Sequence, residues 1–145
     1  IRLLNMGVEP VLIAATLRMV VAQRLLRKIC SQCKTPYEIT PDQLMGLGIT
    51  IQFAGSQKIR LFKGKGCDAC HGKGYKGRLG IYEVLELTEE IKQLVVKNAP
   101  PYEIRMAASR VGMESLREVG VKKLFAGLTT IEEVIRVTTG AEDGQ

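Results

Sequence analysis

The pattern of apolar and polar positions at the start of the chain predicts a helix followed by a strand. Apolar residues at positions 8, 12, 13 and 17 recur with helical spacing, and Pro10 stands where the first turn of a helix accepts a proline. From Met19 onward, the run V-V-A-Q-R-L-L-R leads directly to Cys30 and has the composition of a buried strand. We therefore predict a short helix over 8–17 and favour a strand over 19–29, where the periodicity is also compatible with a helix.

Shorter elements are predicted for the middle of the chain. Thr40, Pro41 and Gln43 have the order of an N-cap, a first helical residue and a capping-box partner. Two β-prone segments flank a Gly-Ser-Gln turn and predict a hairpin. The predicted elements are a helix from Thr40 to Gly46 or Gly48, hairpin strands over 49–54 and 58–63, and a further strand over 78–85.

The last third of the chain predicts four short helices, which are separated by helix-capping residues, by Pro100-Pro101 and by Gly112. Thr88 is placed to cap the first helix, and the spacings Ser115–Glu118 and Thr130–Glu133 are typical of capping boxes. Apolar residues at helical spacing favour a local core over a docking face: Leu116, Val119, Leu124, Val134 and Ile135. The predicted helices span 89–97, 103–111, 115–126 and 130–137.

Composition restricts the class of protein. The chain has 145 residues, of which 46% are hydrophobic and 25% charged, which is enough to bury a core and excludes a disordered chain, a collagen-like repeat or a small disulfide-stapled toxin. No apolar run approaches the roughly 20 residues that span a bilayer. The first residue is Ile, so we expect a piece of a longer protein.

The charge is unevenly distributed. Residues 1–80 carry 13 Lys and Arg against 4 Asp and Glu, whereas residues 81–145 carry 8 against 11. Between Lys58 and Arg78 there are seven basic residues and a single acid, Asp68. Such a stretch favours phosphate, nucleic acid or an acidic protein surface as a neighbour, or else is a solvated surface of a basic protein.

Four cysteines form two C-x-x-C pairs separated by 33 residues: Cys30, Cys33, Cys67 and Cys70. Two thiolates on a tight turn can occupy two corners of a tetrahedron, and a second such turn completes the coordination of one ion. Disulfides or unpaired thiols are the alternatives, and the absence of a secretory signal disfavours disulfides. We predict a structural Zn²⁺ site with no open position for catalysis, and we leave His71 outside the ligand set.

Four segments, taken together and in order, resemble one family. They are M-G-V-E-P-V-L-I-A-A-T-L, V-A-Q-R-L-L-R-K-I-C, G-C-D-A-C-H-G-K-G-Y-K-G-R-L-G-I-Y-E-V, and the pair G-M-E-S-L-R-E-V-G and G-L-T-T-I-E-E-V-I-R-V-T. They are similar to the C-terminal part of the type II secretion and type IV pilus assembly ATPases, over roughly residues 1–140. In that family the four cysteine positions bind zinc.

The resemblance implies an α/β fold, namely the C-terminal portion of a RecA-like ATPase domain with a tetracysteine zinc-binding insert and a C-terminal bundle of short helices. It implies a cytoplasmic homohexamer that binds ATP and Mg²⁺ and works on an inner-membrane platform protein. The corresponding parts are the end of the ATPase core over 1–29, the insert over 30–77, a returning strand over 78–87, the helical subdomain over 88–140 and a frayed tail over 141–145.

The resemblance also bears on catalysis. The chain contains no G-x-x-x-x-G-K-[ST] phosphate loop, so we expect the Walker A and B motifs to lie upstream and this region alone to be inactive. No catalytic residue is assigned within it. Gln23, Arg24 and Arg78 lie in family motifs and are candidates for nucleotide or subunit contacts, because arginines at ring interfaces can reach a neighbour's phosphates. The alternatives are an ion pair within the fold for Arg24 and an exposed position on the basic zinc lobe for Arg78.

Two other functions compete with the motor. A zinc-ribbon nucleic-acid binder is compatible with the basic stretch and the two cysteine turns, although Phe62 and Tyr75 alone do not make a stacking platform. The element C-D-A-C-H-G-K-G resembles a repeat that Hsp40-type chaperones carry in four copies. This chain contains one copy, so a client-binding chaperone is the least favoured of the three functions. We expect no nucleic-acid partner.

Overall fold

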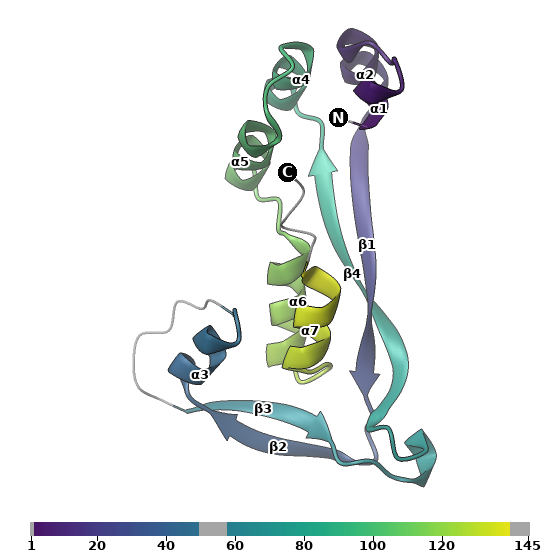
Figure 1. Ribbon diagram of the computed structural model, residues 1–145, viewed down its shortest axis with the longest axis vertical. Helices are drawn as coiled ribbons and strands as arrows, with labels where there is room; N and C mark the ends of the chain where they lie inside the picture. The colour runs from purple at the N-terminus through teal and green to yellow at the C-terminus, as the bar shows by residue number, and fades with distance from the viewer. Residues whose placement is uncertain (1, 50–57, 140–145) are drawn as a thin grey trace. The chain divides into compact units, whose positions relative to one another are not determined.

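Two separate two-stranded sheets organise the part of the chain that the structure describes (Figure 1). The computed structural model describes residues 2–49 and 58–139. Strand β1 (Met19–Ile29) pairs with β4 (Tyr75–Glu86), and the two run in opposite directions (Figure 1). Strand β2 (Lys34–Ile39) pairs with β3 (Ile59–Gly64). Among the described residues, no helix is long and apolar enough to cross a membrane.

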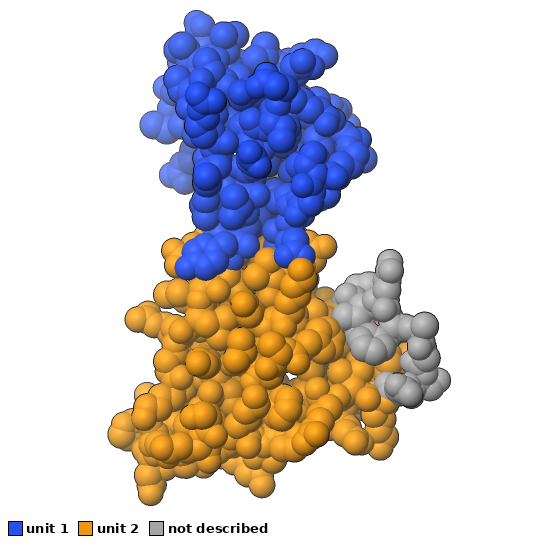
Figure 2. Space-filling view, turned by 180° about the vertical axis from the view of Figure 1, so that it is seen from behind, with its two compact units in different colours: residues 1–22, 82–115, 145 blue, residues 23–81, 116–144 orange. Residues whose placement is uncertain are grey.

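The chain divides into two compact units, which Figure 2 colours separately. Unit 1 comprises residues 1–22 and 82–115, and unit 2 comprises residues 23–81 and 116–144. Strands β1 and β4 contribute residues to both units.

Unit 1 is built from helices around a small apolar core. Helix α2 (Pro10–Thr16) begins at a proline, and α4 (Glu89–Val96) begins after Thr88, whose hydroxyl accepts from the Ile91 N–H. The core contains buried and half-buried residues of the β4–α4 and α5 segments: Leu85, Leu87, Ile91, Leu94, Val95, Ile104, Ala107, Ala108 and Met113, with Leu17. The remaining helices are α1 (Arg2–Asn5) and α5 (Pro101–Arg110).

Unit 2 combines the β2–β3 pair and parts of β1 and β4 with the helices α3, α6 and α7. The strands are antiparallel and in register from the pair Lys34 and Gly64 to the pair Ile39 and Ile59. Helix α6 contacts both α7 and β3, and its Leu116 and Leu124 are buried together with Val134 of α7, which confirms that this apolar stripe is a local core. The helices are α3 (Pro41–Gly46), α6 (Leu116–Phe125) and α7 (Ile131–Thr138).

Most of the predicted elements are present, and their starts follow local chemistry. The capping box at α3 is complete, because Thr40 accepts from the Gln43 N–H at 3.2 Å and the Gln43 side chain accepts from the Thr40 N–H at 3.0 Å. Thr130 caps α7 in the same manner, but the Glu133 side chain does not complete the predicted box. That carboxylate binds two arginines instead.

The second strand of the predicted hairpin over 49–54 and 58–63 is confirmed. The second strand is β3, but its partner is β2, which the sequence pattern did not predict. Of the first predicted strand, residues 50–54 lie outside the described residues, and Ile49 precedes them without belonging to a strand.

The helices after residue 88 do not form one bundle. Helices α4 and α5 pack in unit 1, whereas α6 and α7 pack in unit 2 with the cysteine segment. The expected helical subdomain over 88–140 is therefore divided between the two units, and β4 contributes Leu85 to the core of unit 1 and the buried Ile81 to unit 2. Strand β4 also begins at Tyr75, three residues before the predicted start.

Candidate metal centre

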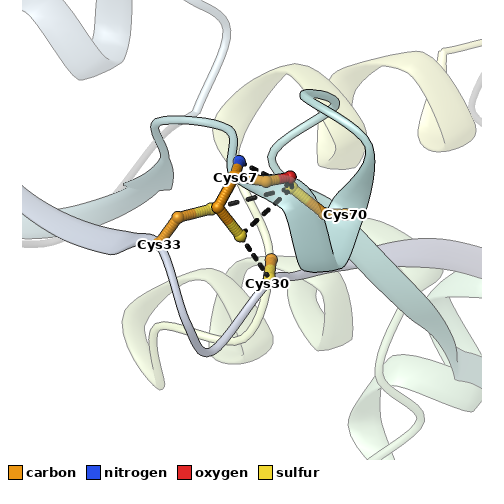
Figure 3. Close-up of side chains that lie close together, drawn as sticks. All are labelled: Cys30, Cys33, Cys67 and Cys70. Carbon is orange, nitrogen blue, oxygen red and sulfur yellow. Dashed lines mark hydrogen bonds between the residues drawn. The ribbon is translucent and has the colours of Figure 1, made fainter.

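The four cysteines come from two turns of unit 2 that lie against each other (Figure 3). Cys30 directly follows β1, and Cys33 closes a turn in which its N–H donates to the Cys30 carbonyl at 3.3 Å. Cys67 precedes the 3₁₀ helix η1 (Asp68–Cys70), which contains Cys70. Strands β1 and β2 therefore meet at the first turn, and β3 and β4 meet at the second.

The sulfur atoms are arranged as a tetrahedral site requires. All four Sγ atoms lie within 4.8 Å of one another, and none of the cysteines is in a disulfide. The Sγ atoms of Cys30 and Cys67 are 3.8 Å apart, and those of Cys33 and Cys70 are 3.9 Å apart. Four sulfurs about 2.3 Å from one Zn²⁺ would be about 3.8 Å apart along each edge of the tetrahedron. The residues therefore fit a four-thiolate zinc ion.

Backbone hydrogen bonds favour the thiolate at one of these cysteines. Burial opposes ionisation of Cys70, but the N–H groups of Cys67 and Gly74 donate to its Sγ, each at 3.2 Å, and the pKa is lowered to about 7. Burial raises the pKa of Cys33 to about 11 and also raises the pKa of Cys67. A metal ion must therefore displace protons from most of the site, so its affinity falls as the pH falls.

Glycines allow the two turns to approach more closely than other residues would permit. A Cβ atom on Gly64 would lie 2.0 Å from the Gly74 carbonyl oxygen, and one on Gly66 would lie 2.6 Å from the Gly72 carbonyl oxygen. Such distances are impossible without movement of the backbone. The Gly74 carbonyl also accepts from the Cys30 N–H at 3.0 Å, so the close approach connects both cysteine pairs.

We expect Gly64→Ala to weaken metal binding strongly, because the added methyl group would push the Gly74 segment away from Cys30. Gly46→Ala is a matched control, since a Cβ atom there meets nothing within 4 Å. The measurement is the bound zinc per chain after dialysis against a graded series of chelator concentrations. Equal zinc retention by the two variants would contradict the close-packing argument.

His71 lies outside the cluster, as predicted. It is exposed and adopts the left-handed conformation with a φ of 51° at the end of η1. The ligand group contains the four cysteines alone within the described residues.

A second charged cluster of unit 2 surrounds the buried carboxylate of Glu133 on α7. Its side chain is fully buried, whereas those of Arg27 and Arg136 are 50% and 56% exposed. Arg27 donates to the carboxylate from its backbone N–H at 2.7 Å and from Nε at 2.8 Å, and Arg136 donates from Nε at 3.0 Å and from Nη2 at 2.8 Å. Burial opposes ionisation of Glu133, but these donors outweigh it and lower the pKa to about 2.

Known proteins match this chain along most of its length. The sequence model of the family described as "Type II/IV secretion system protein" matches residues 1–136. The chain belongs to this family. The matched range contains the four cysteines and the charged cluster of Arg27, Glu133 and Arg136.

Individual relatives are pilus and secretion ATPases. The chain is 44% identical over 137 residues to the type IV pilus assembly ATPase PilB of Thermus thermophilus, covering 94% of this chain and 15% of the relative. It is 42% identical over 135 residues to PilB of Myxococcus xanthus, covering 92% and 24%. It is 36% identical over 137 residues to the type II secretion system protein E of Pseudomonas aeruginosa, covering 94% and 26%. The chain therefore spans about a quarter or less of the length of these relatives.

The other residues singled out in the sequence are exposed on the β1–β4 pair. Gln23 and Arg24 lie on β1, where the Arg24 side chain donates to the Gln23 carbonyl at 3.1 Å, and Arg78 lies on β4. None of the three belongs to the cysteine cluster. Arg24 makes no ion pair within the described residues. The structure therefore does not support the alternative that Arg24 pairs with a carboxylate of its own fold.

Sequence reasoning missed the cluster around Glu133. The residue was interpreted as a capping-box partner because it follows Thr130 at the right spacing. Arg27 is 106 residues away in the sequence, so no local pattern connects it with Glu133. One signal in the sequence indicates that Glu133 is buried. It directly precedes Val134 of the apolar stripe and so lies near the face of the helix that packs inward.

Proposed function

We propose that this chain is the C-terminal, zinc-binding part of a RecA-like ATPase that powers type IV pilus assembly or type II protein secretion. The observation that carries the proposal is a closed four-thiolate site in a chain that matches ATPases of both systems. Exposed apolar side chains along the β1–β4 pair also support a place within a larger domain, because such surfaces are usually covered by other protein: Met19, Val20, Val21, Leu25, Tyr82 and Val84.

In this proposal the catalytic centre for ATP and Mg²⁺ is formed by other parts of the protein. A phosphate loop cradles the nucleotide through backbone N–H groups and a lysine, and the 145 residues contain no such motif. This region thus contributes structure and contacts rather than chemistry.

The zinc ion would be held by Cys30, Cys33, Cys67 and Cys70. Four thiolates leave no coordination position for water or substrate, so the ion supplies cross-linking of the two turns and no Lewis-acid catalysis. The two cysteine turns lie where β1 meets β2 and where β3 meets β4, so the ion would cross-link the β2–β3 pair to the β1–β4 pair.

The assembly would be a cytoplasmic homohexamer that acts on an inner-membrane platform protein. Gln23, Arg24 and Arg78 are proposed to contact a neighbouring subunit or its nucleotide, since all three are exposed and the arginine fork matches phosphate oxygens. The exposed basic residues of the cysteine lobe (residues 30–49 and 58–77) fit an acidic protein surface at the same machine.

The structure offers little support for the alternative of a nucleic-acid binder. Base stacking needs open aromatic faces. Here Lys34 Nζ lies 4.1 Å from the centre of the Phe62 ring, and Arg27 lies 4.3 Å from that of Tyr75. Lys63 similarly lies 5.5 Å from the centre of the Tyr37 ring. These rings already have cationic partners of their own chain.

We expect the 145-residue chain to release no phosphate from ATP above background, whereas the full-length protein should hydrolyse ATP. In the full-length protein, Cys67→Ser should abolish pilus assembly or secretion while retaining nucleotide binding, because the change affects the zinc-binding region and not the phosphate site. Phosphate release, fluorescent-nucleotide binding and assembly or secretion assays measure these quantities. ATP turnover by the 145-residue chain that survives repeated purification would refute this division of roles.

A further inference from the structure

Arg27 and Arg136 together carry two positive charges, whereas the Glu133 carboxylate that binds both carries one negative charge. The Arg27 guanidinium binds Oε1 of Glu133 through Nε at 2.8 Å and Nη2 at 2.7 Å, whereas the Arg136 guanidinium binds Oε1 through Nε at 3.0 Å and Oε2 through Nη2 at 2.8 Å. One carboxylate neutralises one arginine, so the cluster of three side chains carries one surplus positive charge. The two arginines also repel each other, as the lowering effect of Arg136 on the pKa of Arg27 shows, although the net pKa of Arg27 is raised by Glu133.

The geometry leaves one edge of each guanidinium group available. Arg27 uses Nε and Nη2 toward Glu133, and Arg136 uses the same two atoms. Within residues 2–49 and 58–139, neither Nη1 group has a hydrogen-bond partner. Both side chains are about half exposed, so these donors can be reached from solvent.

The arginines are held in place before any ligand arrives. Glu133 fixes both side chains, and the guanidinium group of Arg27 also stacks on the Tyr75 ring, 4.3 Å from its centre. The Tyr75 hydroxyl forms a hydrogen bond of 2.8 Å with the Thr130 hydroxyl at the start of α7. Fixing long side chains in advance removes much of the entropy cost that weakens surface charge pairs.

We propose that Arg27 and Arg136 form a binding site for a phosphate group, with Glu133 and Tyr75 as positioning residues. A phosphate dianion is favoured over a carboxylate, because its higher charge matches the surplus and its additional oxygen atoms can accept from both guanidinium groups. The site is separate from the cysteine cluster and does not depend on the proposed motor function.

The experiment is a titration of the 145-residue chain with inorganic phosphate at low ionic strength and constant pH. Arginine side-chain Nε–Hε signals in ¹⁵N NMR spectra report each arginine separately. We expect saturable shifts of the Arg27 and Arg136 signals, with an affinity about tenfold lower in Arg136→Gln. Arg60→Gln is the matched control, since Arg60 is an exposed arginine of the same unit and should change the affinity less than about twofold.

Two further arms separate a built site from general charge. Arg136→Lys keeps the charge but loses the planar fork, so it should also weaken phosphate binding. Acetate at the same ionic strength should bind more weakly than phosphate. The proposal is overturned by shifts spread evenly over all exposed arginines, by equal losses in Arg60→Gln and Arg136→Gln, by full affinity in Arg136→Lys, or by acetate binding as tightly as phosphate.

Discussion

Cys67→Ser should release the metal and unfold the cysteine lobe while unit 1 stays folded. Helix α6 contacts β3, but β2 and β3 form only a two-stranded sheet, and so small a sheet is at best marginally stable in water without further support. Structural zinc contributes on the order of 10 kcal/mol in small domains, more than so small a core can replace. Unit 1 has its own core around Ile91 and Ala107, which contains no metal ligand.

Amide hydrogen exchange with the zinc-bound wild type as reference tests this directly. Protection should be lost over 34–39 and 59–64, the two strands of the hairpin, and retained over 89–96 and 101–110, the helices of unit 1. His71→Ser is the matched control, because His71 lies next to Cys70 but is exposed and outside the ligand group. Unchanged protection of the hairpin in Cys67→Ser would show that the ion is incidental to the lobe.

The elements that the sequence predicted well have causes that act over a few residues. The capping box of Thr40 and Gln43 places α3 correctly, and Thr88 and Thr130 place the starts of α4 and α7. The C-x-x-C spacing likewise contains the whole geometry of each cysteine turn. The sequence spacing does not show that the two cysteine turns lie against each other, because that contact depends on the fold.

Strand β2 could not be predicted from its own residues. The segment K-T-P-Y-E-I contains Pro36, and a proline lowers the probability of a strand because it cannot donate to the ladder. In a two-stranded sheet every strand has an open edge, so the missing N–H need not cost a hydrogen bond. The cysteine turn and the partner β3 determine this strand, and both lie beyond a local window.

The division into units was hidden for a similar reason. Four short helices in succession favour one bundle, but α6 packs against Ile81 and β3, which are far away in the sequence, as well as against α7. Gly120 of α6 shows the contact, because a Cβ atom there would meet Val134 of α7 at 3.1 Å and Ile81 at 3.8 Å. A glycine inside a helix is an unfavourable residue for helix formation, and close packing accounts for it.

Glu133→Gln should lower the free energy of unfolding by about 2–4 kcal/mol at pH 7. The carboxylate is fully buried and accepts from Arg27 and Arg136, and replacing it leaves a buried amide that cannot accept all of these donors. Glu132→Gln is the matched control: the residue is adjacent but exposed, so its substitution should cost less than about 0.5 kcal/mol. Urea denaturation, which leaves the ionic strength unchanged, measures both.

The pH dependence identifies the carboxylate itself as the cause. The pKa of Glu133 in the folded protein is about 2, below the ordinary value of 4.5, so the unfolded chain takes up a proton more readily than the folded one. Its contribution is therefore complete above pH 4.5, and it is lost as the pH falls through about 2; its full size is about 3 kcal/mol. Protonation of the cysteines and of other carboxylates affects the wild type and Glu133→Gln alike. The difference between these two proteins should consequently shrink from pH 7 to pH 3. A difference that stays constant over this range would show that Glu133 acts through packing and not through its charge.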